Sequence, residues 1–582
     1  MNIGIDFGST YSTVAKYDSS KCCAEAMTLA EGASASIPSV VSISKKGVIT
    51  SGAAAKEQVG KKTVRIYEAF KMLINETNNE MLRHRGYDSE NTPQLITSYF
   101  LESVLQGAMK REGCERIDNV VICAPEIWWN DVHTLDGRQV LRTVLKDEID
   151  LPVKDVRVVT EPEAASAFIA YNYEKETKNS FNGHLLLIDY GGGTLDLTLT
   201  QVTSDGKGSM EISYRESGGA GENHPDAKGN TTIGKAGIAY MQDVVTRALL
   251  DAGMLEPDEI VDYTSADFVA AVKDLESQMK SADRIKDIEE VFGEYGKYSK
   301  FAKILDEDPI DFISLEYAEE EVPVTYQHLF SAYREIIENV LETELNRIAQ
   351  LTKGHLGIDP RTPAVGARDD FKIAMVGGFC TFYLVRQQIA EIYTLDTNNA
   401  IDMRVKNVSV DKQEQAIALG AALLAEGKVV LKKTARFSIG IHSQGYDGSD
   451  RLAYGIKYHQ TVEPGKPYFL CFTEEDGDVP SNRITYGGIR NNITSFAIEY
   501  SSSRNRGGLL KLKAEMIQKL QKIPDEGFWN LGFSMDESEA ISFHMVPKML
   551  GDASGISTPD PIVLGRFSSL FELTEVKEVT IL

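Results

Sequence analysis

Two stretches of the chain repeat the same order of residue types about 180 residues apart. The first, NIGIDFGSTYSTVA, covers residues 2–15, and the second, LLLIDYGGGTLDLTLT, covers residues 185–200. Each is an apolar run followed by an aspartate, an aromatic residue, a glycine-rich turn with a hydroxyl, and a second apolar run. One such hairpin is commonly a structural turn only. The repetition indicates that both hairpins share a chemical role.

These residue types predict phosphate and metal chemistry. Successive backbone N–H groups of a glycine-rich turn can form a nest for phosphate oxygens. Asp6 and Asp189 end their strands just before the turns; a carboxylate there repels phosphate but can hold Mg²⁺, which bridges to phosphates. Ser9, Thr10 and Thr194 add hydroxyl donors. We therefore expect two hairpins that face each other across a cleft and clamp a nucleoside triphosphate with Mg²⁺.

Three further stretches belong to the same pattern. Residues 158–171, VVTEPEAASAFIAY, place Glu161 at the end of a strand and Pro162 at the start of a helix. Residues 373–393 read as strand, Gly-Gly turn and helix, a shape suited to a nucleoside. Residues 414–427, EQAIALGAALLAEG, form a helix of small residues that can pack closely against its neighbours.

Apolar runs alternate with helical patterns up to about residue 427, which predicts an α/β fold. A helix is expected after Thr92 as N-cap, with Pro93 at its first position. The two hairpins add antiparallel strands, so the sheets should be mixed. Buried strands are expected at residues 3–7, 119–124, 156–160, 185–189 and 373–376. The acidic, aromatic residues 283–325 are expected to be a solvated insertion on a peripheral subdomain.

After about residue 435 the strands are short, β-branched or aromatic, and separated by turn residues, which predicts a β-sandwich. One helix is expected within it, because apolar residues recur at helical spacing in GLLKLKAEMIQKLQK. Its stripe consists of Leu509, Leu512, Met516, Ile517 and Leu520. The expected domains are residues 1–427, a linker at 428–435, and residues 436–582.

Composition narrows the class of protein. The chain has 582 residues and a net charge of −25, which disfavours nucleic-acid and anionic-membrane binding. Its six cysteines are too few for a disulfide framework and lack metal-binding spacing. No apolar stretch reaches the length needed to span a bilayer, and no signal peptide precedes the first strand. We expect a cytoplasmic protein.

The five motifs, in this order, resemble the actin–hexokinase–heat-shock ATPase superfamily, and more narrowly the seventy-kilodalton heat-shock chaperone family to which DnaK belongs. The resemblance runs from residue 1 to about 427 and continues more weakly to about 550. It implies a two-lobed actin-like ATPase domain followed by a smaller all-β substrate-binding domain. ATP or ADP with Mg²⁺ would be the ligand, and slow ATP hydrolysis the reaction.

The resemblance also implies roles for individual residues. Asp6 and Asp189 would organise Mg²⁺, and Lys71 would contact the γ-phosphate. Glu161 and Asp196 would position or polarise the attacking water. The nucleotide-binding residues would be Gly8, Ser9, Thr10, Tyr11, Gly191, Gly192, Gly193, Thr194, Glu276, Lys280, Gly377 and Gly378. Pro125 and Arg138 fit the family's relay from the nucleotide to the substrate domain.

The sequence departs from the family at several places. The adenosine turn reads Gly-Gly-Phe-Cys-Thr, so an arginine that would stack on adenine is replaced by Phe379, which would either stack on the base or block its site. The linker keeps Val429, Val430 and Leu431 but continues with lysines in place of an aspartate. We expect no helical lid after the sandwich, and therefore a fast and weakly gated exchange of peptide.

Three functions compete. The first is a divergent, lidless chaperone-like ATPase that controls the binding of unfolded or extended polypeptides, with a co-chaperone or nucleotide-exchange factor as a further partner. The second is a nucleotide-dependent scaffold protein without peptide-chaperone activity. The third is a small-molecule kinase, which is disfavoured because no catalytic aspartate motif for an acceptor hydroxyl is found.

Overall fold

The structure is a computed structural model that divides into two compact units. Unit 1 comprises Met1–Phe168, Lys207–Arg215 and Ile417–Leu582, and unit 2 comprises Ile169–Gly206 and Glu216–Ala416. The structure describes all residues except 31, 60, 62, 77–78, 127, 129–136, 207, 222–235, 258–260, 264, 296–297, 364–367, 395–409, 445–449, 475–476, 480–485, 488–497, 503–505, 513–527, 540, 549–561, 567–570 and 579–582.

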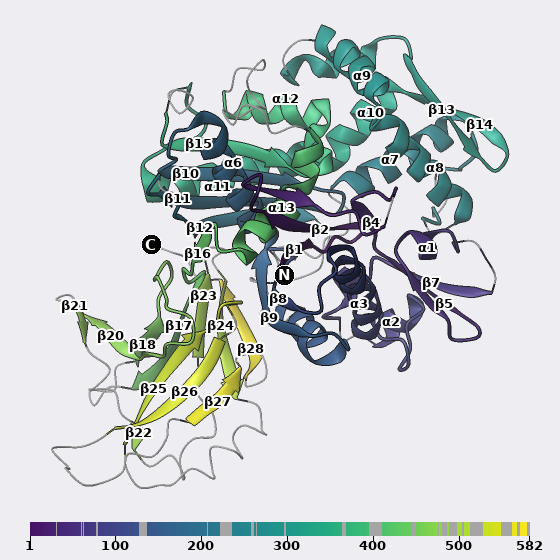
Figure 1. The fold of residues 1–582 in the computed structure, drawn as a ribbon. Helices are drawn as coiled ribbons and strands as arrows, with labels where there is room; N and C mark the ends of the chain where they lie inside the picture. Colours follow the sequence, from purple (N-terminus) through teal and green to yellow (C-terminus); the bar gives the residue numbers. More distant parts are fainter. Residues whose placement is uncertain are drawn as a thin grey trace. The chain divides into compact units, whose positions relative to one another are not determined.

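The N-terminal part of unit 1 is built on a mixed sheet of strand order β3-β2-β1-β8-β9, with β4 beside β2 (Figure 1). β1 pairs antiparallel with β2 and parallel with β8, which is itself parallel to β9. The strands are β1 (Asn2–Asp6), β2 (Tyr11–Asp18), β3 (Cys23–Ala26), β4 (Ser36–Pro38), β8 (Ile117–Ala124) and β9 (Val153–Thr160). The predicted mixed α/β class is therefore confirmed. The strands predicted at residues 3–7, 119–124 and 156–160 are also confirmed, as β1, β8 and β9.

Helices and a small sheet pack around this mixed sheet. The predicted helix is α3, whose N-cap Thr92 accepts a hydrogen bond from the N–H of Leu95 and whose C-cap is left-handed Gly113. The other elements are β5 (Val40–Ser44), β6 (Ile49–Ser51), β7 (Val64–Glu68), α1 (Ala53–Lys56), η1 (Phe70–Leu73), α2 (Asn79–His84), α3 (Pro93–Glu112), α5 (Gly137–Thr143), η2 (Val144–Glu148), α6 (Glu161–Thr177) and α13 (Val410–Ala425). The core of this N-terminal part of unit 1 is one hydrophobic cluster that includes Ile3, Ile5, Phe7, Phe70, Phe100, Leu105, Ile122 and Val158.

The small-residue helix packs closely, as predicted. A Cβ added to Gly4 in β1 would lie 2.2 Å from the backbone nitrogen of Ala422 in α13. One added to Gly420 would lie 1.7 Å from the carbonyl oxygen of Ala164 in α6. Backbone therefore approaches backbone at both places, which only glycine permits.

The C-terminal part of unit 1 has two antiparallel sheets, as predicted for a β-sandwich. Gly455 of one sheet packs against Phe533 of the other, because a Cβ there would lie 2.7 Å from its ring. One sheet has the order β21-β20-β18-β17-β23-β24-β28, and the other β19-β25-β26-β27 with β22 beside β25. Their strands are β17 (Phe437–Gln444), β18 (Asp450–Ile456), β19 (Tyr468–Phe469), β20 (Cys471–Glu474), β21 (Gly477–Val479), β22 (Tyr486–Gly487), β23 (Ile498–Ser502), β24 (Arg506–Leu512), β25 (Phe528–Met535), β26 (Ile541–Lys548), β27 (Ile562–Arg566) and β28 (Phe571–Glu578). β12 (Met210–Gly221) pairs in parallel with β16 (Val430–Lys432).

The helix predicted around the stripe of Leu509 and Leu512 is wrong at its start. Both residues lie in β24, which pairs with β23 on one side and β28 on the other. Backbone partners on two sides favour the strand over the helical spacing of a few leucines. Met516, Ile517 and Leu520 lie outside the described residues.

Unit 2 contains the strand order β15-β10-β11, with β10 and β11 forming the second predicted hairpin. The predicted strands at 185–189 and 373–376 are confirmed. Its elements are β10 (Gly183–Tyr190), β11 (Thr194–Ser204), α7 (Gly237–Asp251), α8 (Ala266–Met279), α9 (Ala282–Glu294), η3 (Tyr298–Asp306), β13 (Asp311–Tyr317), β14 (Glu320–Thr325), α10 (Tyr326–Ala332), η4 (Tyr333–Glu338), α11 (Asn339–Leu356), β15 (Phe371–Val376), η6 (Gly378–Thr381) and α12 (Tyr383–Ile392).

Residues 283–325 are more than a solvated insertion. They form α9, η3 and the β13–β14 hairpin, which bury Phe292, Phe301 and Phe312 in the core of unit 2. The Phe292 and Phe301 ring centroids lie 6.0 Å apart. The many acidic residues of this segment suggested a solvated surface, but the aromatic residues between them form an apolar face that packs into the core.

Candidate functional site

Lys71 and Glu161 are joined by a hydrogen-bonded ion pair in unit 1. Lys71 Nζ donates to Glu161 Oε1, and the two side chains are 4% and 14% exposed. Asp6 lies close enough that both charges act on its carboxyl. The structure thus brings together three of the predicted catalytic residues from positions far apart in the sequence.

Aromatic packing and a left-handed residue place Lys71. The Phe7 ring, next to Asp6, packs against Phe70 with ring centroids 6.0 Å apart, and Lys71 Nζ lies 5.8 Å from the Phe7 centroid. Ala69 precedes the short helix η1 with φ 52° and ψ 26°, a conformation that non-glycine residues rarely adopt. Such local strain is found where surrounding structure fixes a functional side chain.

Glu161 is held by the start of helix α6. Glu163 Oε2 accepts hydrogen bonds from the N–H and the Oγ1 of Thr160, and the N–H of Glu163 donates to Thr160 Oγ1 over 3.1 Å. This reciprocal arrangement is a capping box, which fixes the first helical turn. Glu161 therefore leaves the end of β9 in a defined direction.

The electrostatics around Asp6 favour a cation. Burial, reinforced by the charge of Glu161 and opposed by Lys71, raises the pKa of Asp6 to about 7. Two carboxylates thus share a single nearby lysine. A divalent cation would relieve their repulsion, so the donor set fits Mg²⁺ held through Asp6.

The first glycine turn is held by Ser39 and carries exposed side chains. Ser39 Oγ donates to the carbonyl of Gly8 over 2.7 Å, and the N–H of Ser39 donates to the carbonyl of Thr10 over 2.8 Å. Ser9 is partly buried, while Thr10 and Tyr11 are exposed. A Cβ on Gly8 would lie 2.0 Å from the Tyr11 carbonyl oxygen, so this turn requires glycine.

In the second hairpin, in unit 2, two aspartates occupy paired positions on neighbouring strands. Asp189 in β10 and Asp196 in β11 are opposite each other in the antiparallel register, and both are buried. Gly377 follows β15 with φ 86°, and a Cβ there would lie 2.5 Å from Asp189 Oδ1. Two buried carboxylates side by side again suit a cation, whose presence would offset their repulsion.

The glycines of this hairpin lead directly into helix α7. The N–H of Gly191 donates to the carbonyl of Thr194, which closes the turn over 2.9 Å. The N–H groups of Gly237 and Ile238, at the start of α7, donate to the carbonyls of Gly191 and Gly192. Gly193 completes the turn. The hairpin is thereby fixed to the first turn of α7.

The Phe379 side chain belongs to the core of unit 2. It packs against Tyr190, Tyr240 and Phe382 with ring centroids 5.2 to 5.5 Å apart. Gly378, beside it, begins η6. Whether Phe379 stacks on the base or blocks its site stays a prediction.

Glu276 and Lys280 lie at the end of α8. Lys280 Nζ donates to Glu276 Oε1 over 2.7 Å, and the side chains are 54% and 44% exposed for lysine and glutamate. An i,i+4 pair of this kind is common on helix surfaces. Their predicted contact with adenosine stays a prediction.

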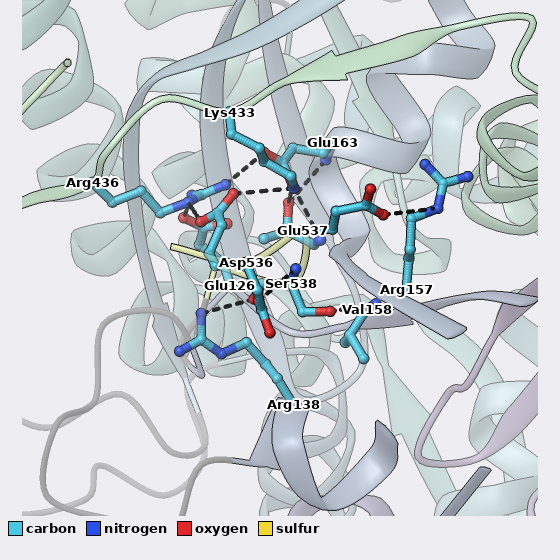
Figure 2. Close-up of polar contacts among 12 residues, drawn as sticks. Glu126, Arg138, Arg157, Val158, Glu163, Lys433, Arg436, Asp536, Glu537 and Ser538 are labelled. Carbon is cyan, nitrogen blue, oxygen red and sulfur yellow. Dashed lines mark hydrogen bonds and ion pairs between the residues drawn. The ribbon is translucent and has the colours of Figure 1, made fainter. Parts of the chain in front are cut away.

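Sequence reasoning missed a buried ionic cluster in unit 1 (Figure 2). Arg436, 1% exposed, binds Glu126, Glu163 and Glu539 at once. Its guanidinium carbon lies 3.9 Å from the Tyr214 ring centroid. The Thr-x-x-Glu spacing of residues 160–163 is a capping motif that could have been recognised in the sequence. No local sequence pattern predicts the partners of Arg436.

Arg138, predicted as part of a relay, contacts the C-terminal sheets. Its Nη1 donates to the carbonyl of Ser538 over 3.3 Å, in the turn between β25 and β26. Pro125 directly precedes Glu126, one of the partners of Arg436. Both relay residues are thus adjacent to the ionic cluster.

Known proteins are similar to this chain over most of its length. The Hsp70 protein family matches residues 2–216. The chaperone protein DnaK of Thermosipho africanus is 24% identical over 493 residues, which cover 84% of this chain and 70% of that protein. DnaK of Thermotoga maritima is 24% identical over 502 residues with the same coverage. DnaK of Endomicrobium trichonymphae is 32% identical over 209 residues, covering 35% of this chain and 30% of that protein.

Within the part of the chain that the structure describes, no helix combines the length and apolarity needed to cross a bilayer.

Proposed function

Because this chain is a divergent member of the Hsp70 family, with that family's two-lobed ATPase domain and C-terminal β-sandwich, we propose that it is a slow, Mg²⁺-dependent ATPase of the chaperone type. The observation that carries the proposal is the cluster of Asp6, Lys71 and Glu161. A buried lysine held by one carboxylate beside another is a costly arrangement, and costly arrangements of charge concentrate at functional sites.

The residues of unit 1 have distinct roles in the proposed hydrolysis of ATP. Lys71 places its charge where negative charge accumulates on the transferred γ-phosphoryl group. Glu161 holds Lys71 through one carboxylate oxygen, and its carboxylate orients the attacking water. The Gly8, Ser9 and Thr10 turn presents N–H and hydroxyl donors to the phosphates. Positioning and electrostatics account for most of the catalysis, as in phosphoryl transfer generally.

The second hairpin has the complementary role within unit 2. Asp189 and Asp196 provide carboxylates, and Gly191, Gly192, Gly193 and Thr194 provide a phosphate-binding turn. Asp196, with Glu161, would position or polarise the water. Asp6 and Asp189 are the residues that would hold Mg²⁺, which would supply charge neutralisation at the phosphates. Gly377, Gly378, Glu276 and Lys280 are proposed to border the nucleoside.

We further propose that nucleotide controls the binding of extended apolar polypeptides by residues 436–582, with residues 428–435 as linker and 1–427 as the ATPase domain. A β-sheet edge with side-chain pockets is suited to such peptides. A co-chaperone or nucleotide-exchange factor would accompany this cycle, and we propose a cytoplasmic location. The alternative is a nucleotide-dependent scaffold that does not respond to peptide.

One assay separates these functions. Steady-state ATP hydrolysis is measured with Mg²⁺, alone and with an unfolded apolar polypeptide such as reduced, carboxymethylated α-lactalbumin. Stimulation of turnover by the polypeptide supports the chaperone. ATP binding without hydrolysis, or hydrolysis indifferent to polypeptide, supports the scaffold and contradicts the chaperone proposal.

A further inference from the structure

Three phenylalanine rings form a closed triangle next to the proposed catalytic residues of unit 1. Phe70 and Phe100 meet edge to face with ring centroids 5.6 Å apart, and the centroid of Phe7 lies 6.0 Å from each of the other two. All three side chains are buried in the same core cluster. Aromatic rings at these separations attract one another directionally, in addition to burying apolar area. Each ring therefore limits the positions open to the other two.

Two of the rings belong to residues that adjoin the candidate site in the sequence. Phe7 directly follows Asp6 at the end of β1, and Phe70 directly precedes Lys71 in η1. The contact between Phe7 and Phe70 thus joins the segment that carries a carboxylate of the site to the segment that carries its ammonium group. Lys71 Nζ also lies 5.8 Å from the ring centroid of Phe7, within the range of a cation–π contact.

The third ring comes from an element that is well fixed by itself. Phe100 lies inside α3, a helix of 20 residues whose N-cap is Thr92 and whose C-cap is Gly113 in the left-handed conformation. In the sequence Phe100 is far from every candidate site residue, yet its ring contacts both Phe7 and Phe70. Helix α3 is accordingly the support against which the other two rings are placed.

The element that carries Lys71 needs such a support. η1 has only four residues, and its N-cap is Ala69, which has no polar side chain to cap it. A single 3₁₀ turn is a weak element by itself. The ion pair with Glu161 holds the end of the Lys71 side chain, but the backbone of η1 has to be fixed by packing. Phe70, 1% exposed, supplies that packing through its contacts with the other two rings.

We propose that Phe100 is a positioning residue for ATP hydrolysis. By contacting Phe7 and Phe70 together, it fixes the separation between the Asp6 carboxylate and the Lys71 ammonium group. The kinetic part rests on the proposed ATPase function, whereas the structural part does not. Phe100 lies in the core and acts only through the two neighbouring rings. Loss of its ring would let Phe7 and Phe70 shift independently, so the lysine charge would no longer be held where negative charge accumulates in the reaction.

The structural test compares two buried phenylalanines. Phe100→Leu removes a ring from the triangle, whereas the control Phe181→Leu removes a buried ring of unit 2 that contacts Tyr173 with ring centroids 5.6 Å apart. Acetylation of Lys71 by sulfo-N-hydroxysuccinimide acetate is measured by mass spectrometry without nucleotide, with the 34% exposed Lys16 as internal reference. We expect Phe100→Leu to raise the labelling rate of Lys71, which is 4% exposed, at least roughly tenfold through local opening. Phe181→Leu should leave that rate unchanged.

The kinetic test uses the neighbouring ring as a partner. kcat and KM for ATP are measured with Mg²⁺ for Phe100→Leu, Phe70→Leu and the double variant. We expect Phe100→Leu to lower kcat roughly 3- to 30-fold, because a misplaced catalytic group slows the chemical step, and to leave KM within about twofold of the wild type. Since Phe100 acts through its neighbours, the loss of kcat in the double variant should be smaller than the product of the two single losses.

Each outcome decides the inference. Unchanged labelling of Lys71 in Phe100→Leu, or an equal rise in Phe181→Leu, would overturn its structural part. Wild-type kcat in Phe100→Leu, or single losses that multiply in the double variant, would overturn its kinetic part. If the wild-type protein does not hydrolyse ATP, the proposed function fails, and the labelling alone still decides the structural part. Should Phe100→Leu not fold, Phe100→Met fills the site with a longer, adaptable side chain, and the same rise in labelling of Lys71 is expected.

Discussion

Lys71 Nζ and Glu161 Oε1 form a hydrogen bond between residues 90 positions apart in the sequence. Lys71 comes from a short helix that follows a left-handed alanine, and Glu161 from the first turn of a capped α-helix. Because both backbones are held independently of the bond, the lysine charge has a fixed position. A preorganised charge is what phosphoryl transfer requires.

The acidic residues at the hairpins predict a dependence on Mg²⁺. We expect ATP to bind more tightly with Mg²⁺ than with EDTA, and Asp189→Asn to reduce that gain roughly 10- to 100-fold, as for groups that orient a metal's ligands. Isothermal titration calorimetry with and without Mg²⁺ measures both values. Asp18→Asn, at the end of β2 and bonded to Ser20, is the control and should behave like the wild type. Equal ATP affinity with and without Mg²⁺ would contradict the metal assignment.

Close packing of α13 predicts a large effect of one methyl group. Gly420→Ala should lower the free energy of unfolding by about 1–3 kcal/mol or more, because the new Cβ would collide with the Ala164 backbone. Gly354→Ala is the matched control in helix α11, where a Cβ meets nothing within 4 Å. That change should stabilise the protein by roughly 0.5–1 kcal/mol. Chemical denaturation measures both, and changes of the same sign would refute the packing.

The buried position of Phe379 predicts a cost in stability without a cost in binding. Phe379→Leu should lower the free energy of unfolding by about 1–3 kcal/mol and leave the ATP dissociation constant unchanged within about twofold. Tyr263→Leu, at a residue 49% exposed, should change stability by less than about 0.5 kcal/mol. A large loss of ATP affinity in folded Phe379→Leu would show instead that the ring contacts the base.

Much of the fold could be predicted because local sequence patterns determine many of its strands, turns and helices. Apolar runs, glycine-rich turns and the cap at Thr92 predicted the hairpins, the strands and helix α3. The spacing of Leu509 and Leu512 led to the wrong prediction of a helix. Their conformation is decided by strand pairing, and the pairing includes residues distant in sequence. Local patterns carry no information about such partners.

The residues of the candidate site likewise fall into those that the sequence predicted and those that it did not. The aspartates and glycines of the two turns were visible as a repeated motif, and Lys71 was identified by resemblance. The Arg436 cluster was not, because its contacts to Glu126 and Glu163 span 310 and 273 residues. An arginine followed by a strand pattern looks like any surface residue until folding buries it.

The most direct measurement is single-turnover hydrolysis of ATP with Mg²⁺ by the wild type, Lys71→Ala and a control. The control is Lys16→Ala, which breaks a surface pair with Glu112 in the same unit. The account predicts that Lys71→Ala lowers the hydrolysis rate at least roughly 100-fold while retaining nucleotide binding, and that Lys16→Ala hydrolyses at the wild-type rate. Wild-type turnover in Lys71→Ala would contradict the central claim that Lys71 and Glu161 form the site of ATP hydrolysis.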